Sequence, residues 1–181
     1  MSAPACSTSC SSKVPVVSFD KCAPVTNQGQ LQYLFVANIG NPLTDVTDPV
    51  ELAGRIDNSS SAADAIRQFH IIGSKPAAEG QEKVISLDRI IKGVKKHTLQ
   101  IRVDETNATN YDMMRSFECG GKYLVWYQTS GGRIYGGNTG IEATISLDDV
   151  IPEDISAIEE FQGTVKWSAK QHPDVNVSPI A

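Results

Sequence analysis

The fold class follows from residues 122–135, which read KYLVWYQTSGGRIY. The first eight of these residues are rich in aromatic and β-branched side chains, which favour strands. The segment 130–132, Ser-Gly-Gly, supplies the backbone freedom that a tight turn needs, and residues 133–135 are again suited to a strand. The pattern therefore predicts a β-hairpin, and a chain organised around it is expected to be mainly β.

Other segments on both sides of this hairpin also have strand patterns. Residues 99–103, 141–145 and 165–169 alternate apolar and polar side chains, as a sheet with one dry face requires. Residues 31–37 are a compact apolar and aromatic run followed by a glycine-containing turn, which is typical of a buried strand. Residues 66–72 also have a strand pattern, and a turn at 73–76 follows them. We therefore expect strands before and after the hairpin.

Helical signals are fewer. Tyr111, Met114 and Phe117 recur every three residues before Gly120-Gly121, which predicts a helix over about 108–118 packed on the sheet. Asp48-Pro49 is a helix-start signal for a short helix through Leu52 that stops at Gly54.

Three further segments have weaker patterns. A short helix is expected over 153–161, and residues 77–81 are expected to form a loop. Residues 84–91 have apolar side chains at helical spacing, but the segment is short and a strand is the open alternative.

The order of elements has no regular alternation of strand and helix and no detectable repeat. It predicts an α+β, mainly β protein: an antiparallel β-sandwich or partial barrel with one flanking helix. We expect an extended N-terminal arm over 1–30, including a short strand near 14–19, then one domain over 31–173 and a tail over 174–181.

The composition excludes several classes of protein. The 181 residues are 40% hydrophobic and 20% charged, and no apolar run is long enough for a membrane span. A formal charge of −5 argues against a protein that grips nucleic acid, and we interpret the basic run 92–97 as a solvated loop. Residues 1–22 lack the basic start and apolar block of a secretory signal, so assembly in the cytoplasm is expected.

The cysteines suggest a metal only weakly. Cys6, Cys10 and Cys22 lie in the expected arm and Cys119 lies far from them, whereas a structural zinc takes four ligands. Cys119 or one of the histidines could complete the set, but free thiols suit a reducing cytoplasm better. The histidines are His70, His97 and His172.

No pattern of catalytic residues is present in the sequence. Gly131 to Gly140 lacks the spacing of a nucleotide-binding loop, and its glycines suit tight turns. Asp148-Asp149 and Glu153-Asp154 could bind a cation, although acidic residues also suit a helix start. We therefore expect no enzyme activity and no cofactor.

Five segments of the C-terminal half follow one another in a distinctive order. These segments are His97–Ile101, the Glu105–Arg115 helix, Leu124–Tyr127, the turn Ile134–Gly137, and the strand from Trp167 to His172-Pro173. Their order resembles that of tail-tube and tail-ring proteins of bacteriophages, and the resemblance covers less than half of the chain.

The resemblance implies a sandwich or barrel whose subunits pair around a ring in a virion assembled in the host cytoplasm. Rings of this family stack through loops or arms, and DNA passes through the lumen without specific binding. The implied partners are copies of the chain and other tail, neck or portal proteins. A minimal tube protein lacks such an N-terminal arm. The tube, a neck or tail-barrel ring, and another virion component therefore all stay as alternatives.

We expect the assembly contacts to come from the arm and from the second half of the aromatic hairpin. Two alternatives to a tail ring stay open: a capsid decoration or accessory protein, and a small metal-dependent enzyme with an acidic site. The expected assembly residues are Cys6, Cys10, Cys22, Arg133, Tyr135, Gly136, Gly137 and Asn138.

Overall fold

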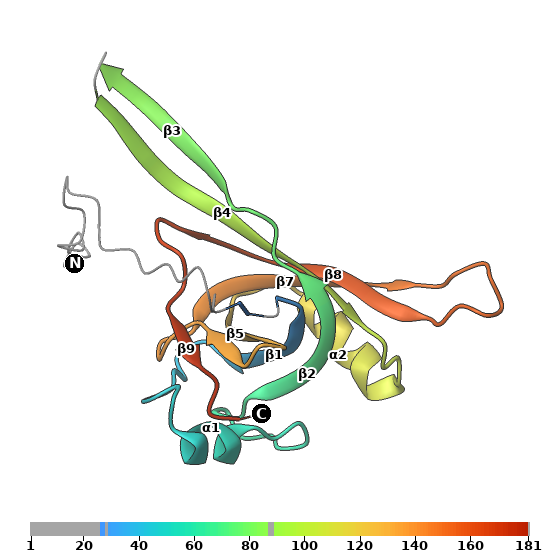
Figure 1. Ribbon diagram of the computed structural model, residues 1–181. Coiled ribbons are helices and arrows are strands. Elements are labelled where there is room, and N and C mark those ends of the chain that lie inside the picture. Colours follow the sequence, from blue (N-terminus) through green and yellow to red (C-terminus); the bar gives the residue numbers. More distant parts are fainter. Residues whose placement is uncertain (1–25, 28, 87–88, 181) are drawn as a thin grey trace.

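The computed structural model describes residues 26–27, 29–86 and 89–180 (Figure 1). Cys6, Cys10, Cys22 and the strand expected near 14–19 lie outside the described residues. The strands are β1 (Leu31–Asn38), β2 (Arg67–Ser74), β3 (Glu79–Ser86), β4 (Arg89–Val103), β5 (Tyr123–Thr129), β6 (Arg133–Tyr135), β7 (Ile141–Val150), β8 (Glu160–Ala169) and β9 (Val175–Val177); the helices are α1 (Pro49–Arg55) and α2 (Ala108–Glu118).

Six strands form a closed antiparallel barrel in the order β1-β2-β4-β8-β7-β5. The barrel closes because β5 pairs with β7 on one side and with β1 on the other, as at Val125, which lies opposite both Ile141 and Val36. Closure satisfies the backbone groups that an open sheet would expose at its edges. The predicted mainly β, antiparallel fold with a flanking helix is confirmed, and its barrel is closed rather than partial.

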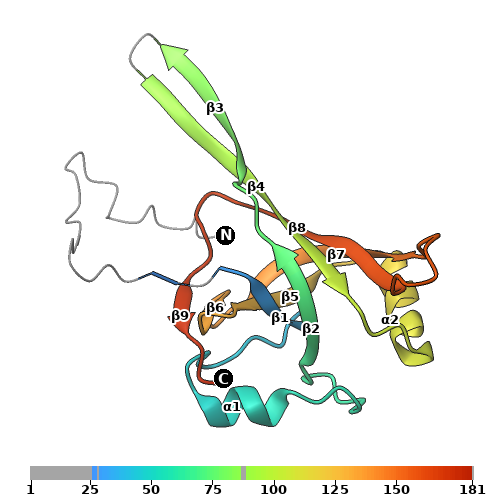
Figure 2. The same ribbon diagram turned by 45° about the vertical axis from the view of Figure 1, so that its right-hand side comes forward.

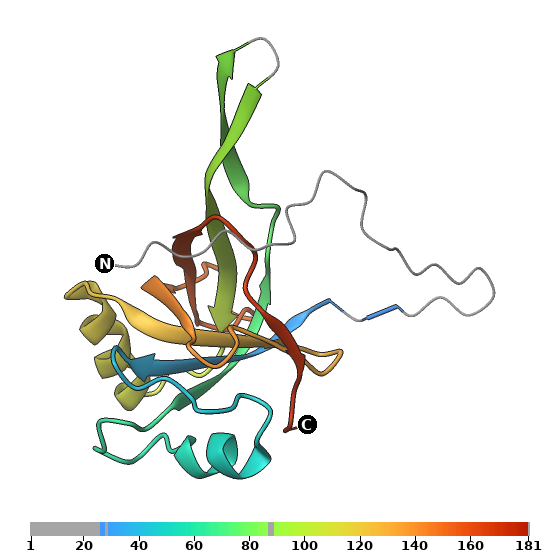
Figure 3. The ribbon, with the colours of Figure 1, turned by 90° about the vertical axis from the view of Figure 1, so that its left-hand side faces the viewer.

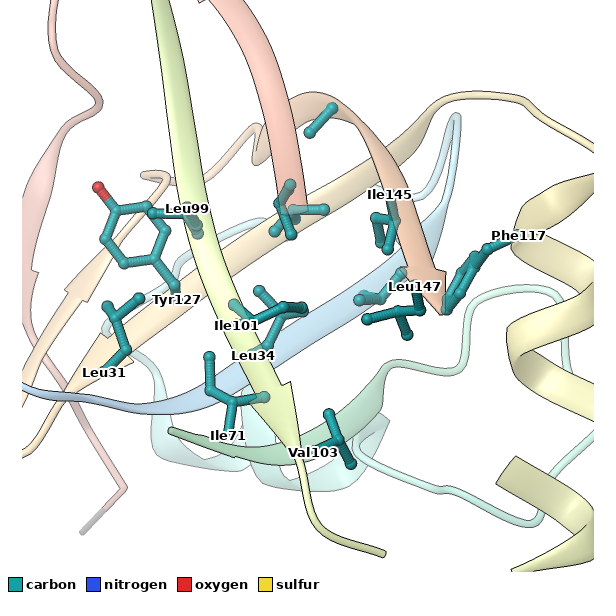
Figure 4. Packing of buried hydrophobic residues seen from close by; sticks show 14 of the residues in the cluster. Leu31, Leu34, Ile71, Leu99, Ile101, Val103, Phe117, Tyr127, Ile145 and Leu147 are labelled. Atoms are coloured by element: carbon teal, nitrogen blue, oxygen red, sulfur yellow. The ribbon is translucent and has the colours of Figure 1, made fainter. Parts of the chain in front are cut away.

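The barrel interior is filled by apolar side chains. Along β7 every second residue from Ile141 to Leu147 is buried, and on β4 the side chains of Leu99, Ile101 and Val103 point inward (Figure 4). A six-stranded barrel is narrow enough for such side chains to occupy its interior completely. The interior of the barrel is therefore a packed core and not a channel.

A second apolar core covers the outer face of β1 and β5. On β1, Leu34 and Val36 face the interior while Phe35 and Ala37 face outward, where they pack with Leu52 of α1. Both faces of these strands are buried, which explains why their sequences are continuous apolar runs instead of alternating patterns. The segment between β1 and β2, including α1, serves as the outer cover.

Helix α2 forms as predicted and packs on β7. The Asn107 side chain caps it by accepting a hydrogen bond from the backbone N–H of Asn110. Met114 and Phe117 are buried in the interior cluster, and Phe117 meets Tyr123 edge to face with ring centroids 5.1 Å apart. Helix α1 begins at Pro49 as expected but continues through Gly54 to Arg55.

Three sequence-based predictions are wrong. The helix expected over 153–161 is absent: residues 151–159 form a loop, and Phe161 belongs to β8, where burial inside the barrel outweighs helical spacing. The loop expected over 77–81 gives way to β3 at Glu79. The basic run 92–97 is part of β4, because backbone pairing with β3 and β8 continues through it.

The segments 84–91 and 174–181 add strands outside the barrel. The first follows the strand alternative and forms parts of the β3–β4 hairpin. Within the expected tail, β9 pairs antiparallel with β6 at Arg133, Ile134 and Tyr135. Neither helix in the described part of the chain has the length and apolar character to cross a membrane.

Candidate functional site

The turn after β6 is a structural support for a buried tryptophan. Trp126 is fully buried, and its indole Nε1 donates a 2.7 Å hydrogen bond to the carbonyl oxygen of Gly137. Gly136 has a φ of +130°, and a Cβ there would lie 2.6 Å from Cδ1 of Trp126. Asn138 accepts a 2.9 Å hydrogen bond from the backbone N–H of Val46. The geometry gives these three expected assembly residues roles inside the subunit.

Arg133 and Tyr135 instead line a cavity at one end of the barrel. The cavity has a volume of about 410 Å³ and lies between the start of β1, the end of β5, β6 and β9. The ring of Tyr135 stacks on that of Tyr127, with centroids 4.7 Å apart. The lining residues are Asn27, Gly29, Leu31, Lys75, Tyr127, Thr129, Arg133, Tyr135, His172, Pro173 and Val175.

Two histidines that are far apart in the sequence meet beside this cavity. The His97 ring is 1% exposed, stacks on Trp167 at 5.0 Å and meets the edge of His172 at 5.3 Å. Burial lowers the pKa of His97, and the positive charges of Lys75, His172 and Lys95 lower it further. We call this end of the barrel, with Lys75, Lys95, His97, Arg133 and His172, the basic end.

The β3–β4 hairpin projects beyond the barrel on the side opposite α1 (Figures 1 and 3). β4 pairs with β8 only from Lys95 onward, so residues 89–94 pair with β3 alone. Val84, Ile85 and Val94 are 65%, 53% and 47% exposed on it. Residues 75–97 carry six Lys and Arg against three Asp and Glu, so the projection is basic.

An acidic extension leaves the barrel in a different direction (Figures 1 and 2). It comprises the end of β7, the loop 151–159 and the start of β8, and we call residues 148–160 the acidic loop. Six acids and no Lys or Arg occur in it. Ile151, Ile155 and Ile158 are largely exposed on it.

The carboxylates of the acidic loop have local structural partners. The Tyr111 hydroxyl lies 2.8 Å from Oε1 of Glu159 and 3.1 Å from Oδ2 of Asp149, and these contacts raise its pKa, that to Glu159 most. Asp154 accepts hydrogen bonds from Ser156, which lower the pKa of Asp154. Among the described residues, no three His, Cys, Asp or Glu side chains are grouped so that they could hold a metal ion.

Arg133 and Tyr135 are expected from the sequence as assembly residues, but the sequence does not group them with the histidines or with Lys75. One signal could have placed His97. It has the same parity as Leu99, Ile101 and Val103, which means that it faces the barrel interior. Cys119 is exposed at the end of α2, where its thiol lies 3.7 Å from the carbonyl oxygen of Arg115.

No protein-family model matches the chain, and no curated protein matches it in sequence.

Proposed function

We propose that this chain is a structural subunit that assembles with copies of itself into a ring of a phage-like tail, in the tube or in the neck. The observation that carries the proposal is the pair of oppositely charged extensions on a closed barrel. The barrel with its flanking helix also fits the architecture that the resemblance to tail-tube and tail-ring proteins implies.

The β3–β4 hairpin needs a partner surface. A two-stranded ribbon in water is only marginally stable, because it buries few side chains on either face. This ribbon exposes Val84, Ile85 and Val94 and leaves the outer edge of β3 without a strand among the described residues. Exposed apolar side chains beside an open edge are typical of surfaces that another chain covers.

The acidic loop supplies a suitable partner from a second copy. Its exposed isoleucines, Ile151, Ile155 and Ile158, match the apolar side chains of the hairpin, and its six acids oppose the basic charge of residues 75–97. The two surfaces differ, so the contact between copies is head to tail. Head-to-tail contacts generate a closed ring when the rotation that relates neighbouring copies brings the last copy back to the first.

The proposed passage for DNA lies between copies of the chain. The interior side chains leave no channel within one copy, so the lumen lies at the centre of a ring of copies. A net charge of −5 suits the wall of such a passage, because an acidic wall does not bind passing DNA.

Light scattering coupled to gel filtration, followed by negative-stain electron microscopy, tests the proposal. We expect rings or short tubes whose formation increases with protein concentration and decreases with salt. A chain that stays monomeric over the whole concentration range and forms no rings contradicts the proposal. Labelling of purified particles separates a tail ring from a capsid accessory protein, since only the former places the chain along the tail.

Charge reversal tests the contact itself. We expect Glu153→Lys with Asp154→Lys to abolish assembly, as should Lys95→Glu with Lys96→Glu, while a mixture of the two double variants recovers it. Glu118→Lys, at the exposed end of α2, is the matched control and should assemble normally. Failure of the mixed variants to assemble better than either alone shows that these two surfaces do not meet.

A further inference from the structure

We propose that the cavity at the basic end of the barrel binds an oxyanion, a phosphate or carboxylate group carried by a small molecule or by an acidic side chain. The proposal rests on the composition of the cavity wall, and only one of its two sources of the oxyanion, the acidic loop of another copy, rests on the proposed function. It assigns a role to Arg133, whose guanidinium has no hydrogen-bond or ion-pair partner among the described residues.

The cavity wall contains two buried hydroxyl groups that lack partners. Tyr127 is 1% exposed and Thr129 is 7% exposed, yet neither Oη nor Oγ1 makes a hydrogen bond to any residue that the structure describes. A buried hydroxyl without a partner costs about 1–3 kcal/mol, so such groups normally pair with an ordered water, an ion or a bound molecule. In Figure 4 the Tyr127 hydroxyl points away from Leu99 and Leu31.

The basic side chains of the wall favour a negatively charged occupant. The cations Lys75 and Arg133 line the cavity together with the imidazole of His172, whereas no Asp or Glu of the described residues does so. Asp174 follows the wall residue Pro173, but its carboxylate lies against Gly137 on the Trp126 turn. Partial burial lowers the pKa of Lys75, as expected for an ammonium group removed from water without a carboxylate.

The remaining wall sets the size and shape of the occupant. Leu31, Pro173, Val175 and the stacked rings of Tyr127 and Tyr135 give the cavity apolar sides, and about 410 Å³ suits a small molecule. An oxyanion can accept hydrogen bonds from the two hydroxyls, from the Arg133 guanidinium and from the Lys75 ammonium. An extended polyanion such as DNA does not fit in this space.

Calorimetric titration of inorganic phosphate into the full chain, at constant ionic strength set with sodium chloride, tests the proposal. We expect saturable binding with one site per chain and a dissociation constant on the order of 1 mM. Arg133→Gln should weaken binding about tenfold, the effect of losing one charge-assisted contact. Arg115→Gln, which removes an exposed arginine of α2, should bind phosphate as the wild type does.

The hydroxyl variants give two readouts of opposite sign. Tyr127→Phe and Thr129→Val should raise the urea midpoint of unfolding without phosphate, since each removes an unpaired buried group, and should weaken phosphate binding at least threefold. A merely structural hydroxyl would lower the midpoint on removal and leave binding unchanged. That result would overturn the proposal.

A second titration identifies the source of the oxyanion. The probe is a peptide with the sequence of residues 151–160 of this chain, with blocked ends. Phosphate binding that the peptide does not displace assigns the site to a small molecule, and peptide binding sensitive to Arg133→Gln assigns it to the acidic loop of another copy. Binding of neither phosphate nor peptide refutes the oxyanion site.

Discussion

Replacement of Trp126 by phenylalanine tests how the second core and the turn after β6 are joined. The smaller ring loses about 40 Å² of apolar contact, worth about 1 kcal/mol, and leaves a small cavity that costs about 1 kcal/mol more. It also removes the 2.7 Å hydrogen bond to Gly137 and leaves that carbonyl oxygen buried, which costs about 1–3 kcal/mol. We therefore expect Trp126→Phe to reduce the free energy of unfolding by about 3–5 kcal/mol.

Trp167→Phe is the matched control because it keeps the stacking on His97. The Trp167 indole makes no side-chain hydrogen bond within the described part of the chain, so its variant should lose only about 1–2 kcal/mol. Urea unfolding followed by far-ultraviolet circular dichroism, at low protein concentration, measures both values. Equal losses in the two variants would refute the inference that the turn is held through the Trp126 indole.

Three further predictions concern separate parts of the molecule. Gly136→Ala should destabilise the fold by about 2–4 kcal/mol more than Gly132→Ala in urea unfolding, because both have positive φ but only the first directs a Cβ into Trp126. The folded state holds His97 with a pKa below its ordinary value of 6.5. The contribution of the neutral imidazole to the free energy of unfolding is therefore fully present above pH 6.5 and is lost as the pH falls below it. Unfolding midpoints between pH 7.5 and 5.5 should therefore decrease in the wild type and decrease less in His97→Phe; equal slopes contradict the assignment. Tyr111→Phe should speed amide hydrogen exchange in the acidic loop, measured by mass spectrometry, because it removes the hydroxyl between two carboxylates; unchanged exchange argues that the loop is held otherwise.

The local elements were predictable from the sequence because each rests on neighbouring residues. The hairpin over 122–135 and the helix near 108–118 are encoded by turn glycines and by the spacing of Tyr111, Met114 and Phe117. Closure of the barrel was not predictable, since the pairing of β1 with β5 joins residues about ninety positions apart, such as Val36 and Val125. The sequence indicated only that β1 and β5 are each a continuous apolar run, which is typical of strands buried on both faces.

The errors have a common physical origin. Ile155, Ile158 and Phe161 repeat at a helical spacing, but the barrel buries Phe161 while the loop exposes the other two residues. Local periodicity cannot reveal that one member of a pattern is recruited by a distant strand. The cavity could not be predicted from the sequence for the same reason. Lys75, Tyr127 and His172 line it together, yet they lie far apart along the chain.

The continuity of β4 has a mechanical consequence. Its 15 residues run without interruption from the projecting hairpin into the barrel, where nine of them pair with β8. A pull along the hairpin would load these backbone hydrogen bonds in parallel, in shear, so that many must break together rather than one after another. An attachment through the hairpin would thus transmit tension directly into the wall of the barrel, the part of the subunit best built to resist it.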